Sequence, residues 1–105
     1  MVRSPISKRL KEARLEAGLS QKKLGIAAGI DEFVASARMN QYETGKHTPN
    51  VEMVQRIATA LKLPVAFFYT ADNSLAILLK RYSKFSDKQK QRLTVFVEKL
   101  AKQAS

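Results

Sequence analysis

Residues 18–49 read GLSQKKLGIAAGIDEFVASARMNQYETGKHTP, and the helix ends and turns in this stretch decide the fold. Gly18 is typical of the residue that follows a helix C-terminus, and Ser20 is a typical N-cap for the next helix. Gly29 indicates a turn, and a further helix is expected to end at about Gly45. The pattern predicts short helices that follow one another across tight turns.

The second of these helices, near residues 21–28, consists largely of small residues. A glycine inside a helix costs about 1 kcal/mol relative to alanine, so Gly25 needs a structural reason. We expect that it allows another helix to approach closely, because two short helices joined by a tight turn cross at short range.

Helical patterns continue on both sides of this stretch. Upstream, Ser4 and Pro5 predict an N-cap and a first helical position, and one face carries Ile6, Leu10, Ala13 and Ala17. Downstream, Asn50 predicts another N-cap, and the apolar face comprises Val51, Val54, Ile57, Ala58 and Leu61. Pro64 begins a fifth short helix, whose aromatic residues are expected in the core or an interface: Phe67, Phe68 and Tyr69.

Two more helices are predicted after a break near residues 71–74. The first carries an apolar stripe formed by Leu75, Leu78, Leu79 and Tyr82. Ser86 and Gln89 have the spacing of a capping box, and a second stripe follows at Leu93, Phe96, Val97, Leu100, Ala101 and Ala104. We therefore predict an all-α chain with five helices in residues 1–70 and two additional helices in residues 71–105.

Composition limits the partners and the chemistry. The 105 residues include 19 Lys and Arg against 9 Asp and Glu, a net charge of +10, which favours binding to nucleic acid over other polyanions. There is no cysteine and one histidine, so we expect no disulfide, no metal site, no cofactor and no enzyme activity. No segment has the roughly 20 apolar residues of a membrane span, and the opening MVRSP lacks the apolar run of a signal peptide. We expect a cytoplasmic protein without a membrane partner.

Residues 6–69 carry a family resemblance in the order and spacing of several short motifs. The motifs are Leu-Ser-Gln-x-x-Leu at 19–24, Ala-Gly-Ile at 28–30, Tyr-Glu-x-Gly-Lys at 42–46, Pro49, and the run 51–61. This set resembles the helix-turn-helix transcriptional regulators of the phage-repressor and Cro class (Xre type). The resemblance implies a five-helix, lambda-repressor-like domain in residues 1–70 whose second and third helices bind double-stranded DNA.

The sequence departs from the pattern of that class between Gly29 and Met39, which are ten residues apart. About four residues have been added within 31–36. Either the recognition helix starts a turn early, with Asp31 as its N-cap, or the turn is enlarged and the helix starts near Ser36. We favour the enlarged turn, because a longer helix would turn the large apolar side chains at 33 and 34 away from the core.

On this interpretation the helix near residues 36–44 enters the major groove, where Arg suits guanine and Asn or Gln suits adenine. The predicted base-reading residues are Ser36, Ala37, Arg38, Asn40 and Gln41. Arg38 and Gln41 are the main candidates, and the alternative for Arg38 is a phosphate contact or a position in solvent. Phosphate contacts are predicted at Ser20, Gln21, Lys22, Lys46, His47 and Thr48. Glu43 should be paired, with Arg9 or Arg14, because an unpaired acid would repel DNA.

The tail in residues 71–105 has three interpretations: a solvated basic face, additional phosphate contacts, or a surface for an acidic partner. Its apolar stripes need a cover, so we predict dimerisation through residues 74–104. Removal of residues 74–105 should leave a folded monomer that binds DNA much more weakly. The predicted function is a sequence-specific DNA-binding regulator, a dimeric repressor. The alternative is an antitoxin-like protein whose C-terminal helices bind a partner protein, and non-specific nucleoid binding is a third possibility.

Overall fold

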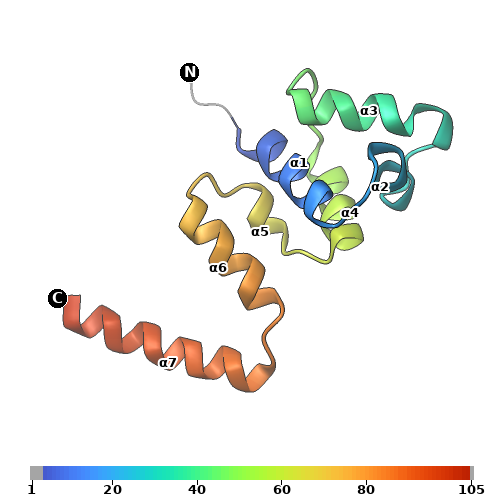
Figure 1. The fold of residues 1–105 in the computed structure, drawn as a ribbon. Helices are drawn as coiled ribbons and strands as arrows, with labels where there is room; N and C mark the ends of the chain where they lie inside the picture. Colours follow the sequence, from blue (N-terminus) through green and yellow to red (C-terminus); the bar gives the residue numbers. More distant parts are fainter. Residues whose placement is uncertain (1–3, 105) are drawn as a thin grey trace.

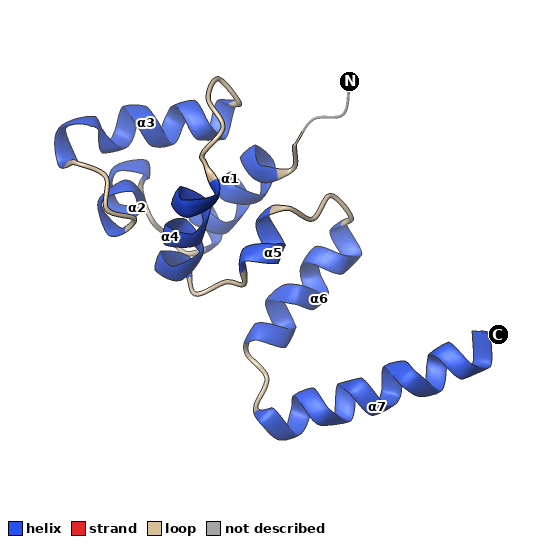
Figure 2. Ribbon diagram, turned by 180° about the vertical axis from the view of Figure 1, so that it is seen from behind, coloured by secondary structure: helices blue, strands red, loops and turns tan. Residues whose placement is uncertain are grey.

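The computed structural model describes residues 4–104, and its secondary structure there is entirely helical. The predicted segments 1–70 and 71–105 include residues 1–3 and 105, which lie outside the described residues. The helices are α1 (Ile6–Glu16), α2 (Gln21–Ala27), α3 (Glu32–Thr44), α4 (Val51–Leu61), α5 (Val65–Phe68), α6 (Asn73–Ser83) and α7 (Asp87–Ala104). The first five form a bundle, and the last two extend from it (Figures 1 and 2). The all-α prediction, with five helices followed by two, is confirmed.

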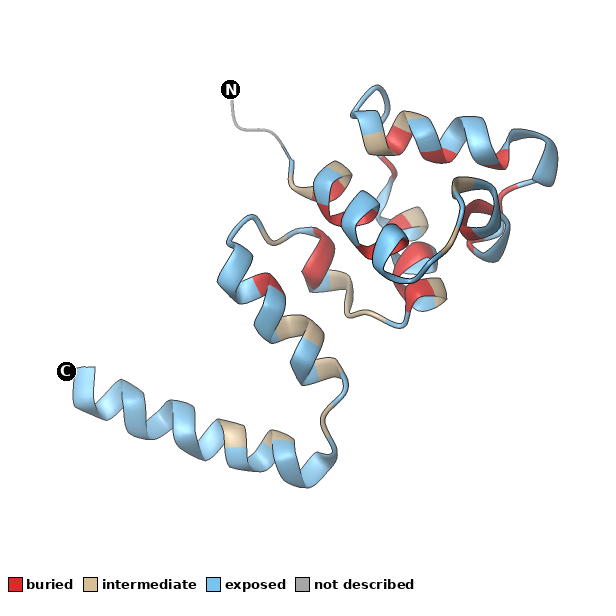
Figure 3. Cartoon of the chain, in the orientation of Figure 1, coloured by how far each residue is buried: buried red, intermediate tan, exposed pale blue. Residues whose placement is uncertain are grey.

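The core lies between α1, α2, α3, α4 and α5 (Figure 3). Its largest fully buried side chains are Phe67, Phe68, Leu10, Leu24, Met39, Ile57 and Val54. The helices α2 and α3 cross at Gly25, where a Cβ atom would lie 2.8 Å from the Cβ of Ala35 and 3.0 Å from its carbonyl oxygen. Gly25 therefore permits the close crossing that the sequence predicted.

Several helix ends follow the predicted caps. The amide of Leu19 donates to the carbonyl of Arg14, and Gly18 has φ +72°, which together form a Schellman C-cap. The Oδ1 atom of Asn50 accepts the amide of Met53 at 2.8 Å. Ser86 and Gln89 form the predicted capping box, with side chains and amides paired in both directions.

Two smaller expectations at helix starts were wrong. Pro5, and not Ser4, occupies the N-cap of α1, although the Ser4 hydroxyl still accepts the amide of Ile6 at 3.3 Å. Val51 is 63% exposed because it opens α4 at the rim of the bundle, whereas the remaining members of its predicted apolar face are buried.

The predicted enlarged turn was also wrong. The recognition helix α3 begins at Glu32, with the side chain of Asp31 accepting the amide of Phe33 at 2.9 Å as an N-cap. Phe33 and Val34 do not pack against the domain: they are 89% and 42% exposed. The physical reason is register. The added residues supply about one helical turn, so the helix extends outward while its buried face stays on the core.

The helix α6 is attached to the bundle by a buried arginine. The Nε atom of Arg9 donates to the carbonyl of Thr70 at 2.8 Å, and its Nη2 atom donates to the carbonyl of Ala71 at 3.0 Å and to Oδ1 of Asn73 at 2.9 Å. Ala76 is the buried residue of α6. These contacts fix the start of α6 against α1 and α5.

The helix α7 projects away from the bundle, on the side opposite α3 (Figure 1). None of its described residues is buried. The radius of gyration is 15.9 Å, larger than the roughly 13 Å of a compact chain of this length, and the longest extent is 53 Å. Among residues 4–104, no helix combines the length and the apolar character needed to cross a membrane.

Candidate nucleic-acid interface

The N-terminus of α2 opens onto the exposed side of α3. The hydroxyl oxygen of Ser20 accepts the amide of Lys23 at 3.0 Å, so Ser20 is the helix cap. The other amides at a helix start have no partner within the helix, and together with the positive end of the helix dipole they favour an anion. Gln21 and Lys22 lie in the first turn of α2, beside the exposed side of α3.

Gln21 links the two helices of the helix-turn-helix. Its Nε2 atom donates to Oδ1 of Asn40 and to Oε1 of Glu43, each at 3.2 Å. The amide group of Gln21 thus bridges the side chains of Asn40 and Glu43 on α3.

Glu43 is buried and paired with Arg14. Its side chain is 3% exposed, and the carboxylate accepts from Nε of Arg14 at 2.5 Å and from Nη2 at 3.0 Å. Hydrogen bonding to Glu43 raises the pKa of Arg14, against the opposing effect of burial, and Coulombic attraction adds to the rise. The pKa of Arg14 is therefore higher in the folded than in the unfolded state. The ion pair adds stability at neutral pH, and this contribution is lost only in strongly alkaline solution, as the pH rises through the folded-state pKa. Arg14 is therefore the partner of Glu43 between the two arginines considered.

These contacts surround a surface hollow, which we call the α2–α3 hollow. It is lined by Lys11, Arg14, Ser20, Gln21, Lys22, Ser36, Asn40, Glu43 and Thr44. The structure thus brings two predicted base-reading residues, Ser36 and Asn40, beside the three predicted phosphate contacts of α2.

Lys11 is a member of the hollow that the sequence analysis did not assign. Lys11 lies in α1, three residues before Arg14, and it is exposed. The spacing to Arg14 was a usable signal, because residues three apart on a helix share a face. Lys11 adds a cation on the side of α1 that borders the hollow.

The main predicted base-reading residues, Arg38 and Gln41, are not among the residues that line the hollow. Successive residues turn by about 100° on a helix, so Arg38 and Asn40 project in nearly opposite directions around α3. Arg38 is exposed, as is Ala37, and Gln41 is partly buried with its carbonyl accepting the amide of His47 at 3.2 Å.

The segment after α3 carries the remaining predicted phosphate contacts. Lys46, His47 and Thr48 are all exposed, between Gly45 at φ +80° and the buried Pro49. The described residues contain no cluster of three or more His, Asp or Glu side chains able to hold a metal ion.

Comparison with known proteins identifies this arrangement. Residues 6–66 match the sequence model of a family described as a helix-turn-helix domain. No curated protein matches the chain significantly. Among solved structures, the crystal structure of the transcriptional regulator BswR is similar, with 45% sequence identity and a TM-score of 0.85 over 90% of this chain and 93% of that one. The chain therefore belongs to the helix-turn-helix domain family.

Proposed function

We propose that the protein is a sequence-specific, double-stranded DNA-binding transcriptional regulator that acts as a dimeric repressor. The observation that carries this proposal is the α2–α3 hollow, where the polar and basic start of α2 lies beside polar side chains on an exposed face of α3. The match of residues 6–66 to the helix-turn-helix family, and the similarity of the chain to the structure of a transcriptional regulator, also support a DNA-binding regulator.

In this proposal α3 lies in the major groove and α2 contacts the phosphate backbone. Asn40, held by Gln21, has the donor and acceptor pair that suits adenine. Ser36, Ala37 and Gln41 complete the base-reading set. Arg38, which projects nearly opposite to Asn40, contacts a phosphate instead, and Lys46, His47 and Thr48 contact the backbone on the far side of α3. A protein bound in this way would repress by excluding polymerase from the site.

The proposed dimer rests on the apolar surface of the C-terminal helices. The exposed large apolar residues that would form this surface include Leu75, Ile77, Leu78, Tyr82, Phe96, Val97 and Leu100. A soluble monomer rarely exposes so much apolar surface along two successive helices. A second copy that covers this surface would place two recognition helices on half-sites about 34 Å apart.

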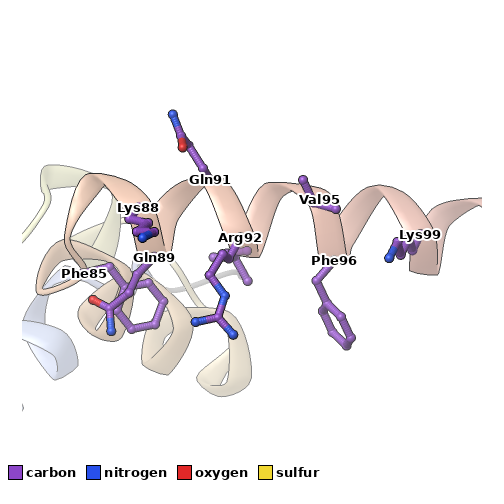
Figure 4. Close-up of a pocket in the computed structure, with 9 residues that line it drawn as sticks. Phe85, Lys88, Gln89, Gln91, Arg92, Val95, Phe96 and Lys99 are labelled. Atoms are coloured by element: carbon purple, nitrogen blue, oxygen red, sulfur yellow. The ribbon is translucent and has the colours of Figure 1, made fainter.

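Two residues on opposite sides of α7 offer a matched pair of substitutions that test this dimer (Figure 4). Phe85, Arg92 and Phe96 extend to one side of the helix, whereas Val95 and Gln91 extend to the other. Phe96 and Val95 are equally accessible, at 57% and 55%. In sedimentation velocity of the full chain, Phe96→Lys should yield monomer and Val95→Lys should leave the dimer intact. A monomeric wild-type protein would refute the dimer, and an acidic protein bound at Lys88 and Arg92 would then favour the partner-protein function.

The DNA-binding proposal is tested by selecting bound duplexes from a random pool at about 150 mM salt, where non-specific phosphate binding is weakened. An enriched palindrome would support a dimer that reads sequence. Asn40→Ala should relax the preference at one position, by up to about 1–3 kcal/mol for a bidentate contact. Lys62→Ala is the control, since Lys62 is the C-cap that follows α4 and lies outside the α2–α3 hollow. Binding without enrichment would refute sequence reading.

A further inference from the structure

Phe33 lies in the first turn of α3, and its side chain is not part of the core. It is 89% exposed, more than any other large apolar side chain of the described residues. The core contacts of α3 are made by Ala35, Met39 and Tyr42, which are all buried. Single exposed apolar side chains are common on protein surfaces, so the exposure of Phe33 becomes informative only together with its position on the helix.

The position of Phe33 on the helix indicates which partner. At about 100° per residue, Phe33, Ala37 and Asn40 follow one another along the side of α3 opposite the buried face. This is the side that the proposed function places in the major groove. Asp31 caps the helix through the amide of Phe33 at 2.9 Å, so the first turn is ordered and its direction is fixed.

The chemistry of this turn excludes a phosphate contact. Asp31 and Glu32 are acidic and exposed, and a benzene ring cannot bind a phosphate oxygen. The apolar feature that base edges present in the major groove is the C5-methyl group of thymine, against which Phe and Ala side chains pack. A phenyl ring on the groove side of α3 therefore suits thymine.

The length of α3 sets the position that Phe33 would read. Phe33 lies four residues before Ala37, about 6 Å along the helix axis. The rise of duplex DNA is about 3.4 Å per base pair. The ring thus reaches one or two base pairs beyond those that face Ala37 and Asn40.

We propose that Phe33 is a specificity-determining residue that recognises a thymine methyl group at the edge of the half-site, through the additional first turn of α3. This inference rests on the proposed DNA-binding function. It assigns a base contact to a turn of the helix for which the polar candidates of the α2–α3 hollow give none.

The test uses the full-length protein and the duplex enriched in the selection experiment. Each thymine is replaced in turn by deoxyuridine, which lacks the methyl group, and dissociation constants are measured by fluorescence anisotropy at about 150 mM salt. Loss of one buried methyl group should weaken wild-type binding about fourfold at a single position in each half-site. Phe33→Ala should weaken binding to the thymine duplex and should lose its sensitivity to deoxyuridine at that position only.

Val34→Ala is the matched control, since Val34 is also exposed but projects about 100° away around the helix. It should bind both duplexes as the wild type does. Both variants alter exposed side chains, and circular dichroism checks that they fold. The inference is overturned if Phe33→Ala binds like the wild type, or if deoxyuridine weakens both proteins equally. An enriched palindrome that is indifferent to Phe33 refutes this inference alone, whereas the absence of any enriched sequence refutes the proposed function together with it.

Discussion

Replacing Gly25 by alanine tests the close crossing of α2 and α3. In an exposed helix interior this change would stabilise the protein by about 0.5–1 kcal/mol, because alanine loses less conformational entropy on folding. At this position the new Cβ atom would lie 2.8 Å from Cβ, 3.0 Å from the carbonyl oxygen and 3.2 Å from Cα of Ala35. Ordinary contacts between carbon atoms are about 3.5–4.0 Å, so the two effects oppose each other.

The steric effect should be the larger one. Two of the three close atoms belong to the backbone of α3, and no side-chain rotation can move them away. Overpacking of a well-packed core costs about 1–3 kcal/mol, and a backbone clash belongs at the upper end of that range. We therefore expect Gly25→Ala to lower the free energy of unfolding by about 1–2 kcal/mol, equivalent to a fall in Tm of about 5–15 °C.

The assay is urea unfolding followed by circular dichroism at one fixed protein concentration, because self-association would change the apparent stability. A double-mutant cycle with Ala35→Gly isolates the contact: the double variant should be more stable than the sum of the single effects by about 1 kcal/mol. Ala37→Gly, on the exposed side of α3, measures the cost of glycine alone. If Gly25→Ala is as stable as the wild type, the packing argument is refuted.

Three further contacts are tested by substitution, two with the same unfolding assay and the third by hydrogen exchange. Glu43→Ala should lower the free energy of unfolding by about 3 kcal/mol, because it leaves the buried Arg14 without its partner; a loss below about 1 kcal/mol would contradict a buried pair. Asn50→Ala should cost about 1 kcal/mol through the loss of the α4 cap, whereas Asn50→Asp should be nearly neutral. Arg9→Met leaves two backbone carbonyls without their donor, so the α6 amides should exchange hydrogen faster; unchanged exchange would show that Arg9 does not hold α6.

The local signals in the sequence predicted helix ends well, because caps depend on one or two nearby residues. Gly18, Asn50 and Ser86 each had a defined partner a few positions away, and the structure pairs them as expected. The role of Gly25 was also predictable, since a glycine inside a helix has a cost that only a close contact explains.

The start of α3 could not be predicted from burial, although a local signal was present. Asp31 is a good N-cap, but the large apolar side chain of Phe33 suggested that the segment packs inward. Apolar residues are usually buried, yet the reverse inference fails for a side chain at a binding surface. Here the local cap was the better guide.

The composition of the α2–α3 hollow was beyond the sequence. Which side of α3 faces the start of α2 depends on how the two helices cross, and that is a property of the packed core. The pattern identified exposed positions such as Arg38 and Asn40 alike, while the structure places only Asn40 against Gln21. Lys11 was missed because α1 is distant from α3 in sequence.

The arginine that attaches α6 has a mechanical consequence. Arg9 donates hydrogen bonds to the carbonyls of residues 70 and 71, and these bonds restrict the orientation of α6 relative to the five-helix bundle. In a dimer that forms through the last two helices, this fixed connection would help to set the distance between the two DNA-binding domains. Bending would then be confined to the short segment between Ser83 and Asp87, where α6 gives way to α7. Such a dimer would bind operators with different half-site spacings with different affinities, because its domains could not move apart freely to fit them.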